Sequence, residues 1–158
     1  MGIAAEHFGN VYIRTTRAET PVLYKNTDKF KIGGLMVIGK VADIVVIGAG
    51  ITLHEANKAK EELAKEKIDI TVVDLYSIKP IDKDSLTEMA KLSRAFITVE
   101  DHYEEGGIGE AVRSAVGNLV PVHSLVVRKM PRSGKPAELL EYEEIDAAAI
   151  VKKIKELR

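Results

Sequence analysis

Short apolar runs recur along the chain, separated by stretches in which apolar residues return every three or four positions. Residues 44–47 are four β-branched apolar residues in a row. A run of this kind is typical of a strand buried on both faces of a sheet. Further β-rich runs predict strands over residues 35–38, 68–74, 95–99 and 122–127.

The intervening stretches have the apolar spacing of helices. After residue 51, Ala59 and Leu63 share one face, and Thr52 and Glu55 have the spacing of a capping box. The same spacing predicts three more helices: after Pro80 and Asp82, over residues 108–119, and after Asp146. Strands that alternate with helices predict an α/β fold in which a mainly parallel sheet carries helices on both faces.

The first forty residues have a different pattern. Residues 10–16 are β-branched and aromatic enough to predict a strand. Pro21, Asn26 and the Gly33-Gly34 pair then interrupt the segment repeatedly. We interpret this region as a strand with a long extended connection, since a compact domain seldom opens with so much irregular chain.

Composition excludes several classes of function. The 158 residues include no cysteine, which rules out disulfides, cysteine nucleophiles and cysteine-bound zinc. The net charge is −1, from 23 basic and 24 acidic residues, so nucleic acid and anionic membrane are not expected partners. No apolar run is long enough to span a bilayer and no secretory signal is recognisable, which makes the cytoplasm the expected location.

Two glycine-containing loops resemble phosphate-binding motifs, but each lacks an essential residue. Gly48-Ala49-Gly50 follows a strand, yet Leu53 occupies the third glycine position of a dinucleotide fingerprint. Asp74 lies where a ribose-binding acid could lie. We nevertheless interpret Gly48-Ala49-Gly50 as a tight turn that needs glycine for its backbone angles.

The second loop, Arg132-Ser133-Gly134-Lys135, lacks two features of a P-loop. Lys129 stands where the first glycine should be, and Pro136 stands where serine or threonine should follow the lysine. We therefore interpret this stretch as a basic surface loop, with contact to a partner as the second choice.

An acidic loop follows the strand at residues 95–99. Glu100, Asp101, Glu104 and Glu105 surround His102, and carboxylates this close could share a proton or hold a hard cation. Because no calcium-loop spacing is present, we favour a solvated loop that turns through its glycines into the next helix.

Four stretches together resemble the transketolase family. Residues 46–56, residues 74–82 with Ile78-Lys79-Pro80-Ile81-Asp82, residues 99–112 with Glu100-Asp101-His102-Tyr103, and residues 131–140 resemble its C-terminal domain. Residues 12–17 resemble the end of its middle, pyrimidine-binding domain. The resemblance assigns residues 1–33 to the tail of the middle domain and a linker, and residues 34–158 to the C-terminal domain. It implies a three-layer α/β/α fold with a mostly parallel five-stranded sheet and one antiparallel strand.

The resemblance also implies a function. Transketolases transfer a two-carbon ketol unit between sugar phosphates, using thiamine diphosphate and a divalent cation, Mg²⁺ or Ca²⁺. The motifs that hold this cofactor belong to the N-terminal and middle domains, so this chain is expected to bind no cofactor or metal and to be inactive alone. Its expected role is assembly with those domains into a homodimer.

The resemblance also implies roles for individual residues. Arg17 matches the family's arginine that binds the substrate phosphate. Contact residues are expected in two loops, at Glu100, Asp101, His102 and Tyr103, and at Arg132, Ser133 and Lys135. The alternatives are the corresponding domain of a 2-oxoacid dehydrogenase β subunit or of deoxyxylulose-phosphate synthase, and a regulatory nucleotide-binding module.

Overall fold

A five-stranded sheet forms the middle layer of the computed structural model, which describes residues 2–16 and 19–158. Its strands are β1 (Met36–Ile38), β2 (Ile44–Gly48), β3 (Thr71–Asp74), β4 (Ala95–Val99) and β5 (Val122–Leu125), in the order β1-β3-β2-β4-β5. β1 is antiparallel to β3, and every other neighbouring pair is parallel. The expected mostly parallel sheet with one antiparallel strand is confirmed.

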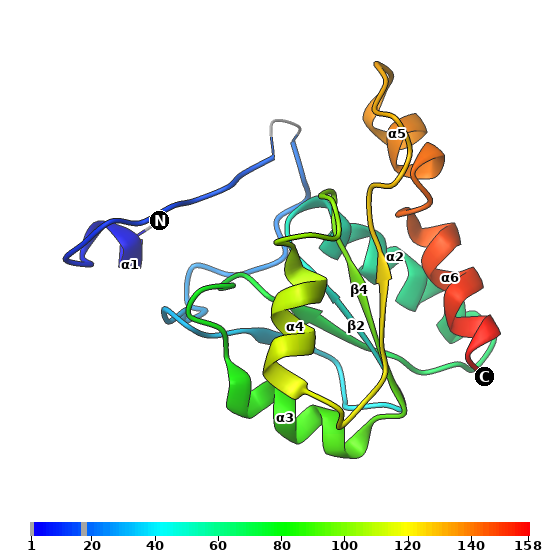
Figure 1. Cartoon of the computed structure of the whole chain (residues 1–158), viewed down its shortest axis with the longest axis horizontal. Helices are drawn as coiled ribbons and strands as arrows, with labels where there is room; N and C mark the ends of the chain where they lie inside the picture. The colour runs from blue at the N-terminus through cyan, green and yellow to red at the C-terminus, as the bar shows by residue number, and fades with distance from the viewer. Residues whose placement is uncertain (1, 17–18) are drawn as a thin grey trace.

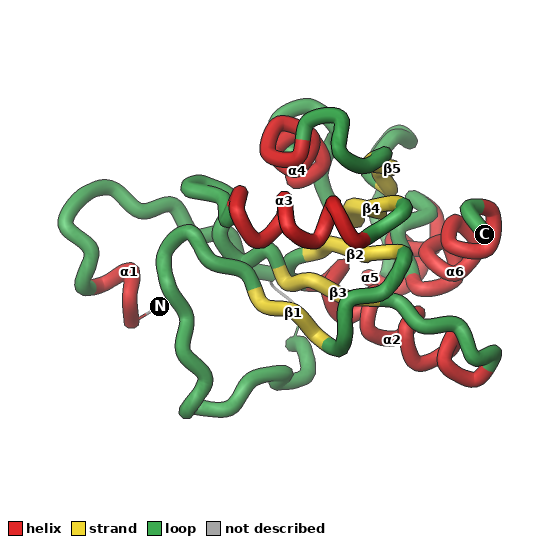
Figure 2. The backbone as a smooth tube through the Cα atoms, turned by 90° about the horizontal axis from the view of Figure 1, so that it is seen from below, coloured by secondary structure: helices red, strands yellow, loops and turns green. Residues whose placement is uncertain are grey.

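Helices cover both faces of this sheet. Figure 2 shows α3 (Lys83–Leu92) and α4 (Ile108–Val116) on one side, and α2 (Ile51–Lys65) and α6 (Ala147–Glu156) on the other. Two short helices, α1 (Gly2–Ala5) and α5 (Pro136–Tyr142), bury no residue. The expected three-layer α/β/α architecture is therefore confirmed, with α1 and α5 outside its layers.

The alternation of side chains along β2 divides the core into two halves. Val45 and Ile47 pack with the apolar residues of α3 and α4, whereas Ile44 and Val46 pack with those of α2 and α6. Every residue of β2 is buried, as the continuous apolar run predicts for a central strand.

All three of these predicted helices form, but the capping box predicted for the helix after residue 51 is wrong. The side chains of Asp82 and Asp146 accept hydrogen bonds from backbone N–H groups at the starts of α3 and α6. At α2, however, Thr52 donates its hydroxyl to the carbonyl of Val99 at 2.8 Å, and Glu55 accepts the N–H of Ala147 at 3.0 Å. Both side chains bind elements distant in sequence, so they do not form the predicted capping box.

The predicted strand over residues 10–16 is wrong. The structure gives these residues no regular secondary structure and leaves most of them exposed. A β-prone segment forms a strand only where a neighbouring strand pairs with its backbone, and β1 instead occupies the edge of the sheet beside β3.

Candidate functional site

An N-terminal arm, residues 2–33 with 2–16 and 19–33 described, crosses the edge where β2, β3 and β4 end. In open α/β sheets, ligands bind at this carboxyl edge, beside the strand at which the order reverses. Here that strand is β2, which lies between β3 and β4. Figure 1 shows the arm in blue, running from its outlying end towards the domain before the chain enters the sheet.

The arm first meets the glycine turn after β2. Gly50 has a φ of 60°, a conformation that favours glycine, and it immediately precedes α2. A Cβ placed on Gly50 would lie 3.6 Å from Cγ2 of Thr16, so the arm lies directly over this turn. The turn is therefore a tight strand-to-helix connection covered by the chain itself.

A bidentate ion pair holds the arm to the loop after β4. Both terminal nitrogens of Arg14 donate to the carboxylate of Asp101, at 2.9 and 3.0 Å, and Nη2 also donates to the Asp101 carbonyl at 3.1 Å. The planar guanidinium matches a carboxylate in this way, which fixes orientation as well as distance. Two residues separated by 87 positions in the sequence are thereby joined.

A buried carboxylate at the end of β3 forms the next anchor. The hydroxyl of Tyr24 donates to Oδ2 of Asp74 at 2.7 Å, and Asp74 is only 6% exposed. Burial raises the pKa of Asp74, against the opposing effects of the Tyr24 hydrogen bond and of nearby His54. Burial and the bonded Asp74 carboxylate also raise the pKa of Tyr24, which keeps its hydroxyl protonated as a donor.

Three packed aromatic rings continue the attachment of the arm towards β1. The ring of Phe30 packs edge-on against Tyr24 at 5.1 Å and against Tyr76 at 5.0 Å between ring centroids. Next to it, the backbone N–H of Gly33 donates to Oγ of Ser77 at 2.9 Å. The arm is thus fixed to this edge by charge, hydrogen bonding and ring packing.

Within the acidic loop, Glu100 anchors helix α4. Glu100 is 3% exposed, and its carboxylate accepts the N–H groups of Ile108 at 2.6 Å and Gly109 at 2.9 Å. Burial raises the pKa of Glu100, while these two hydrogen bonds act in the opposite direction. A Cβ on Gly107 would lie 2.1 Å from Oε2 of Glu100, so the close approach requires glycine there. The prediction of a solvated loop is therefore wrong for Glu100.

Further along the same loop, Glu104 joins two arginines. Arg113 of α4 donates to Oε1 of Glu104 at 2.9 Å, and Arg128, which follows β5, donates to Oε2 at 3.0 Å. The hydrogen bond from Arg128 and the positive charge of both guanidiniums lower the pKa of Glu104. Arg113 also donates to Oγ of Ser124 at 2.6 Å, which ties this network to β5.

The basic loop lies at the tip of a projecting segment, residues 128–144. The guanidinium carbon of Arg132 lies 3.8 Å from the ring centroid of Tyr142, while Ser133 and Lys135 are exposed. Arg128, at the base of this segment, bonds to Glu104 of the acidic loop. The acidic loop is thus connected to the base of the projecting segment, and not to the basic loop at its tip.

Comparison with known proteins identifies the family. The family model described as "Transketolase, C-terminal domain" matches residues 33–150. The chain belongs to the transketolase C-terminal domain family. Transketolases of mouse and human are 48% and 47% identical to it over 160 aligned positions, covering 98% of this chain and 26% of each relative. The chain therefore spans about a quarter of the length of these transketolases.

Solved structures agree with this family. A split gene transketolase, described as an inactive β4 tetramer, superposes with a TM-score of 0.91 at 33% identity, covering 98% of this chain and 52% of that one. The 2-oxoglutarate:ferredoxin oxidoreductase of Magnetococcus marinus superposes with a TM-score of 0.58 at 17% identity, covering 85% of this chain and 20% of that one. The second similarity shows the fold alone.

The remaining predicted site residues are placed as follows. Arg17 lies outside the described residues. His102 binds the carbonyl of Tyr103 through Nδ1 at 2.8 Å, and Tyr103 is 51% exposed. Arg14 and Tyr24 were not predicted as functional residues, because their partners, Asp101 and Asp74, are distant in the sequence. The position of Asp74 at a strand end was the available signal.

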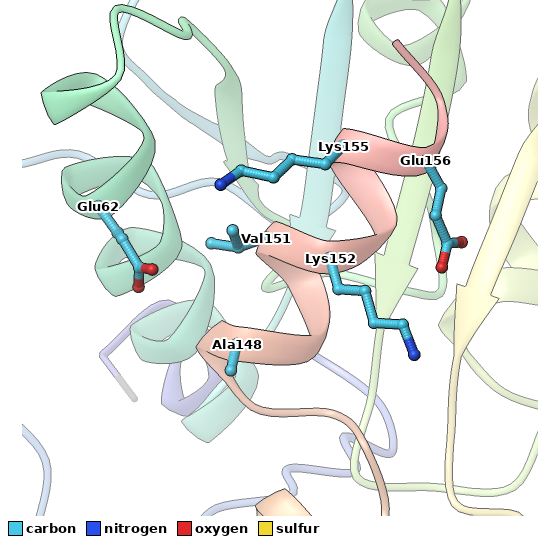
Figure 3. A pocket seen from close by; sticks show the side chains of 6 residues that line it. All are labelled: Glu62, Ala148, Val151, Lys152, Lys155 and Glu156. Carbon is cyan, nitrogen blue, oxygen red and sulfur yellow. The ribbon is translucent and has the colours of Figure 1, made fainter.

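The described residues contain no group of three His, Cys, Asp or Glu side chains that could hold a metal ion. Within the same residues, no helix is long and apolar enough to cross a membrane. Figure 3 shows a shallow groove between α2 and α6, away from the carboxyl edge. Its lining consists of Glu62, Ala148, Val151, Lys152, Lys155 and Glu156.

We expect the Arg14→Ala variant to release the end of the arm while leaving the domain folded. Because an exposed ion pair contributes about 1 kcal/mol or less, the free energy of unfolding should change little. Chymotrypsin should cleave faster after the exposed Tyr12, and Arg14→Lys, which cannot form the fork, should give an intermediate rate. An unchanged cleavage rate in Arg14→Ala would show that Asp101 does not hold the arm.

Proposed function

We propose that this chain is the C-terminal portion of a transketolase that transfers a two-carbon ketol unit between sugar phosphates. The observation that carries the proposal is the identity of 47–48% to mammalian transketolases along 98% of the chain. In this proposal, residues 1–33 are the tail of the middle domain and its linker, and residues 34–158 are the C-terminal domain. The protein acts in the cytoplasm, in the pentose phosphate pathway.

The role of this domain is assembly, and thiamine diphosphate with its divalent cation is held by the other domains. The acidic side chains at the carboxyl edge do not fit a diphosphate–metal group. Glu100 binds two backbone N–H groups, Asp101 binds Arg14, and Glu104 binds two arginines. Since the arm also covers the glycine turn, this edge supports contact between domains rather than ligand binding.

The partners in this proposal are the N-terminal and middle domains and a second copy of the enzyme. The two loops, at residues 101–103 and 132–135, contribute contacts, and Arg17 binds the sugar phosphate in the complete enzyme. A split gene transketolase of closely similar fold is described as a tetramer, which supports self-association of such chains.

Domain replacement tests this function. The corresponding quarter of mouse transketolase would be exchanged for this chain, and ketol transfer would be assayed from a ketose phosphate to an aldose phosphate. We expect the hybrid to be active, an enzyme truncated at the same point to be inactive, and Arg17→Ala in the hybrid to raise the KM for the phosphorylated substrate. A folded hybrid that binds thiamine diphosphate but transfers no ketol unit would contradict the proposal.

A further inference from the structure

A small cavity lies at the amino edge of the sheet, opposite the carboxyl edge that the arm covers. Its walls come from the chain just before β2, β3 and β4 and just after α2 and α6. The volume is about 260 Å³, below the usual range for drug-sized ligands, so the cavity suits a small metabolite. Neighbouring isoleucines add apolar surface to its charged lining, which consists of Asp43, Lys67, Asp69, Arg94 and Arg158.

The three cations of this cavity have no anionic partner within the chain. Lys67, Arg94 and Arg158 take part in no ion pair among the residues that the structure describes. All three are exposed. At the carboxyl edge, by contrast, the arginines that meet the acidic loop are each paired with a carboxylate. The charge at the amino edge is therefore available to a bound anion.

Lys67 has a backbone conformation that is unfavourable for lysine. Its φ is 59°, in the left-handed region that favours glycine. Its N–H donates to the carbonyl of Ala64 at 3.0 Å, and the next N–H, of Ile68, donates to that of Leu63 at 3.0 Å. This pair of bonds at the end of α2 is the Schellman motif, in which the left-handed residue is usually glycine. The sequence thus has a cation where glycine would cost less.

A second strained residue shows what can compensate such a cost. Glu144 has a φ of 57° at the corresponding position after α5, and its carboxylate pairs with Lys129 at 3.0 Å. Lys67 has no such partner among the described residues. The dipole of α2 does not require it either, because Lys65 already lies in the last turn of the helix. The group that Lys67 serves is therefore expected outside the chain.

The two carboxylates of the cavity restrict the chemistry of that group. Asp43 and Asp69 are exposed, and neither is in an ion pair within the described part of the chain. An ionised carboxylate only accepts hydrogen bonds, so it binds hydroxyl groups. Lysine and arginine bind phosphate. Cations and acceptors around one small space therefore match a ligand that carries both a phosphate and hydroxyl groups.

We propose that the cavity at the amino edge binds a small polyol phosphate. Lys67, Arg94 and Arg158 contact its phosphate, and Asp43 and Asp69 accept hydrogen bonds from its hydroxyl groups. The site is separate from the carboxyl edge, and the proposal does not depend on the proposed function.

Calorimetric titration of the 158-residue chain with glycerol 3-phosphate tests the site. We expect one molecule to bind per chain, with a dissociation constant of about 1 mM that increases with added salt. Glycerol, which lacks the phosphate, should not bind. A titration that does not approach saturation at about 10 mM glycerol 3-phosphate would overturn the proposal.

The Lys67→Gly variant separates binding from folding. Glycine adopts the positive φ without strain, so the Tm should rise, whereas loss of the cation should weaken glycerol 3-phosphate binding about tenfold. Arg94→Gln should also weaken binding about tenfold. Lys83→Gln, which removes an exposed cation at the start of α3, should leave binding unchanged. A Lys67→Gly chain that binds as tightly as the original would overturn the assignment of this site.

The Asp69→Asn variant distinguishes a polyol phosphate from free phosphate. The original chain should bind glycerol 3-phosphate more tightly than inorganic phosphate, because only the former offers hydroxyl groups to the carboxylates. In Asp69→Asn, both anions lose the same repulsion, so a preference that falls about threefold would report the lost hydroxyl contact. Equal binding of the two anions by the original chain, or a preference that Asp69→Asn leaves unchanged, would indicate an adventitious ion only and overturn the proposal.

Discussion

Replacing Glu100 with alanine should lower the free energy of unfolding by about 3 kcal/mol, because it removes the acceptor of two hydrogen bonds inside the protein. The N–H groups of Ile108 and Gly109 lie 2.6 and 2.9 Å from the Glu100 carboxylate, and both residues are buried. Without that acceptor they would be left unpaired at the N-terminus of α4. Urea unfolding followed by circular dichroism would measure the loss.

Two further variants sharpen this prediction. Glu100→Gln keeps one acceptor oxygen but turns an amide nitrogen towards the second N–H group, so its loss should be intermediate. Glu105→Ala removes an exposed carboxylate from the same loop and should leave stability unchanged. Equal stability of Glu100→Ala and the original chain would show that the hydrogen bonds of Glu100 contribute nothing net.

The pH dependence of the Glu100 effect follows from its raised pKa. A carboxyl group with a higher pKa in the folded state than in the unfolded state binds more protons when folded, so its contribution to stability is largest in acid. That contribution is lost as the pH rises through the folded pKa. In the original chain, the free energy of unfolding should therefore decline as the pH rises above the ordinary glutamate range. Glu100→Gln should remove this decline.

The arrangement of layers was predictable because it depends on local patterns. The run over residues 44–47 predicted a strand buried on both faces, and the structure places it at the centre of the sheet. Asp82 and Asp146 cap helices through bonds to residues three positions away, which the sequence displays directly. These features need no information about distant parts of the chain.

The predictions from the sequence are wrong where a residue's structure depends on a partner that is distant in the sequence. Glu55 has the spacing of a capping box, but it binds Ala147, 92 residues away. Glu100 belongs to an acidic run, yet the turn through Gly107 brings it under α4 and buries it. The arm has β-prone residues without a strand beside them. Neither periodicity nor composition records such pairings.

The acidic loop after β4 joins several elements of the candidate site. The loop after β4 receives the arm through Asp101, supports α4 through Glu100 and holds the base of the projecting segment through Glu104. Three acidic groups within five residues therefore serve three different attachments. A concentration of carboxylates that resembles a catalytic or metal site is explained here by the number of elements that must be joined at one edge.

The Tyr24→Phe variant should lower the free energy of unfolding by about 1–3 kcal/mol at neutral pH, because it leaves a buried carboxylate without its hydrogen-bond donor. The ring and its packing against Phe30 are retained, so the change isolates the 2.7 Å bond to Asp74. Amide exchange of residues 19–33 should also increase, since the arm loses an anchor. Tyr12→Phe, which alters an 89% exposed tyrosine, is the matched control.

The stability loss of Tyr24→Phe should shrink as the pH falls. The Tyr24 hydrogen bond lowers the pKa of Asp74, so its removal raises that pKa above the already elevated value. The variant then gains more stability than the original chain when Asp74 becomes protonated, because burying a neutral carboxyl group costs less than burying a charged one. The free energies of unfolding of the variant and of the original chain, measured at several pH values, should approach each other in acid. When both proteins also carry Asp74→Asn, this approach should disappear. A loss that stays constant across the acid range would mean that the hydroxyl of Tyr24 does not act through the charge of Asp74.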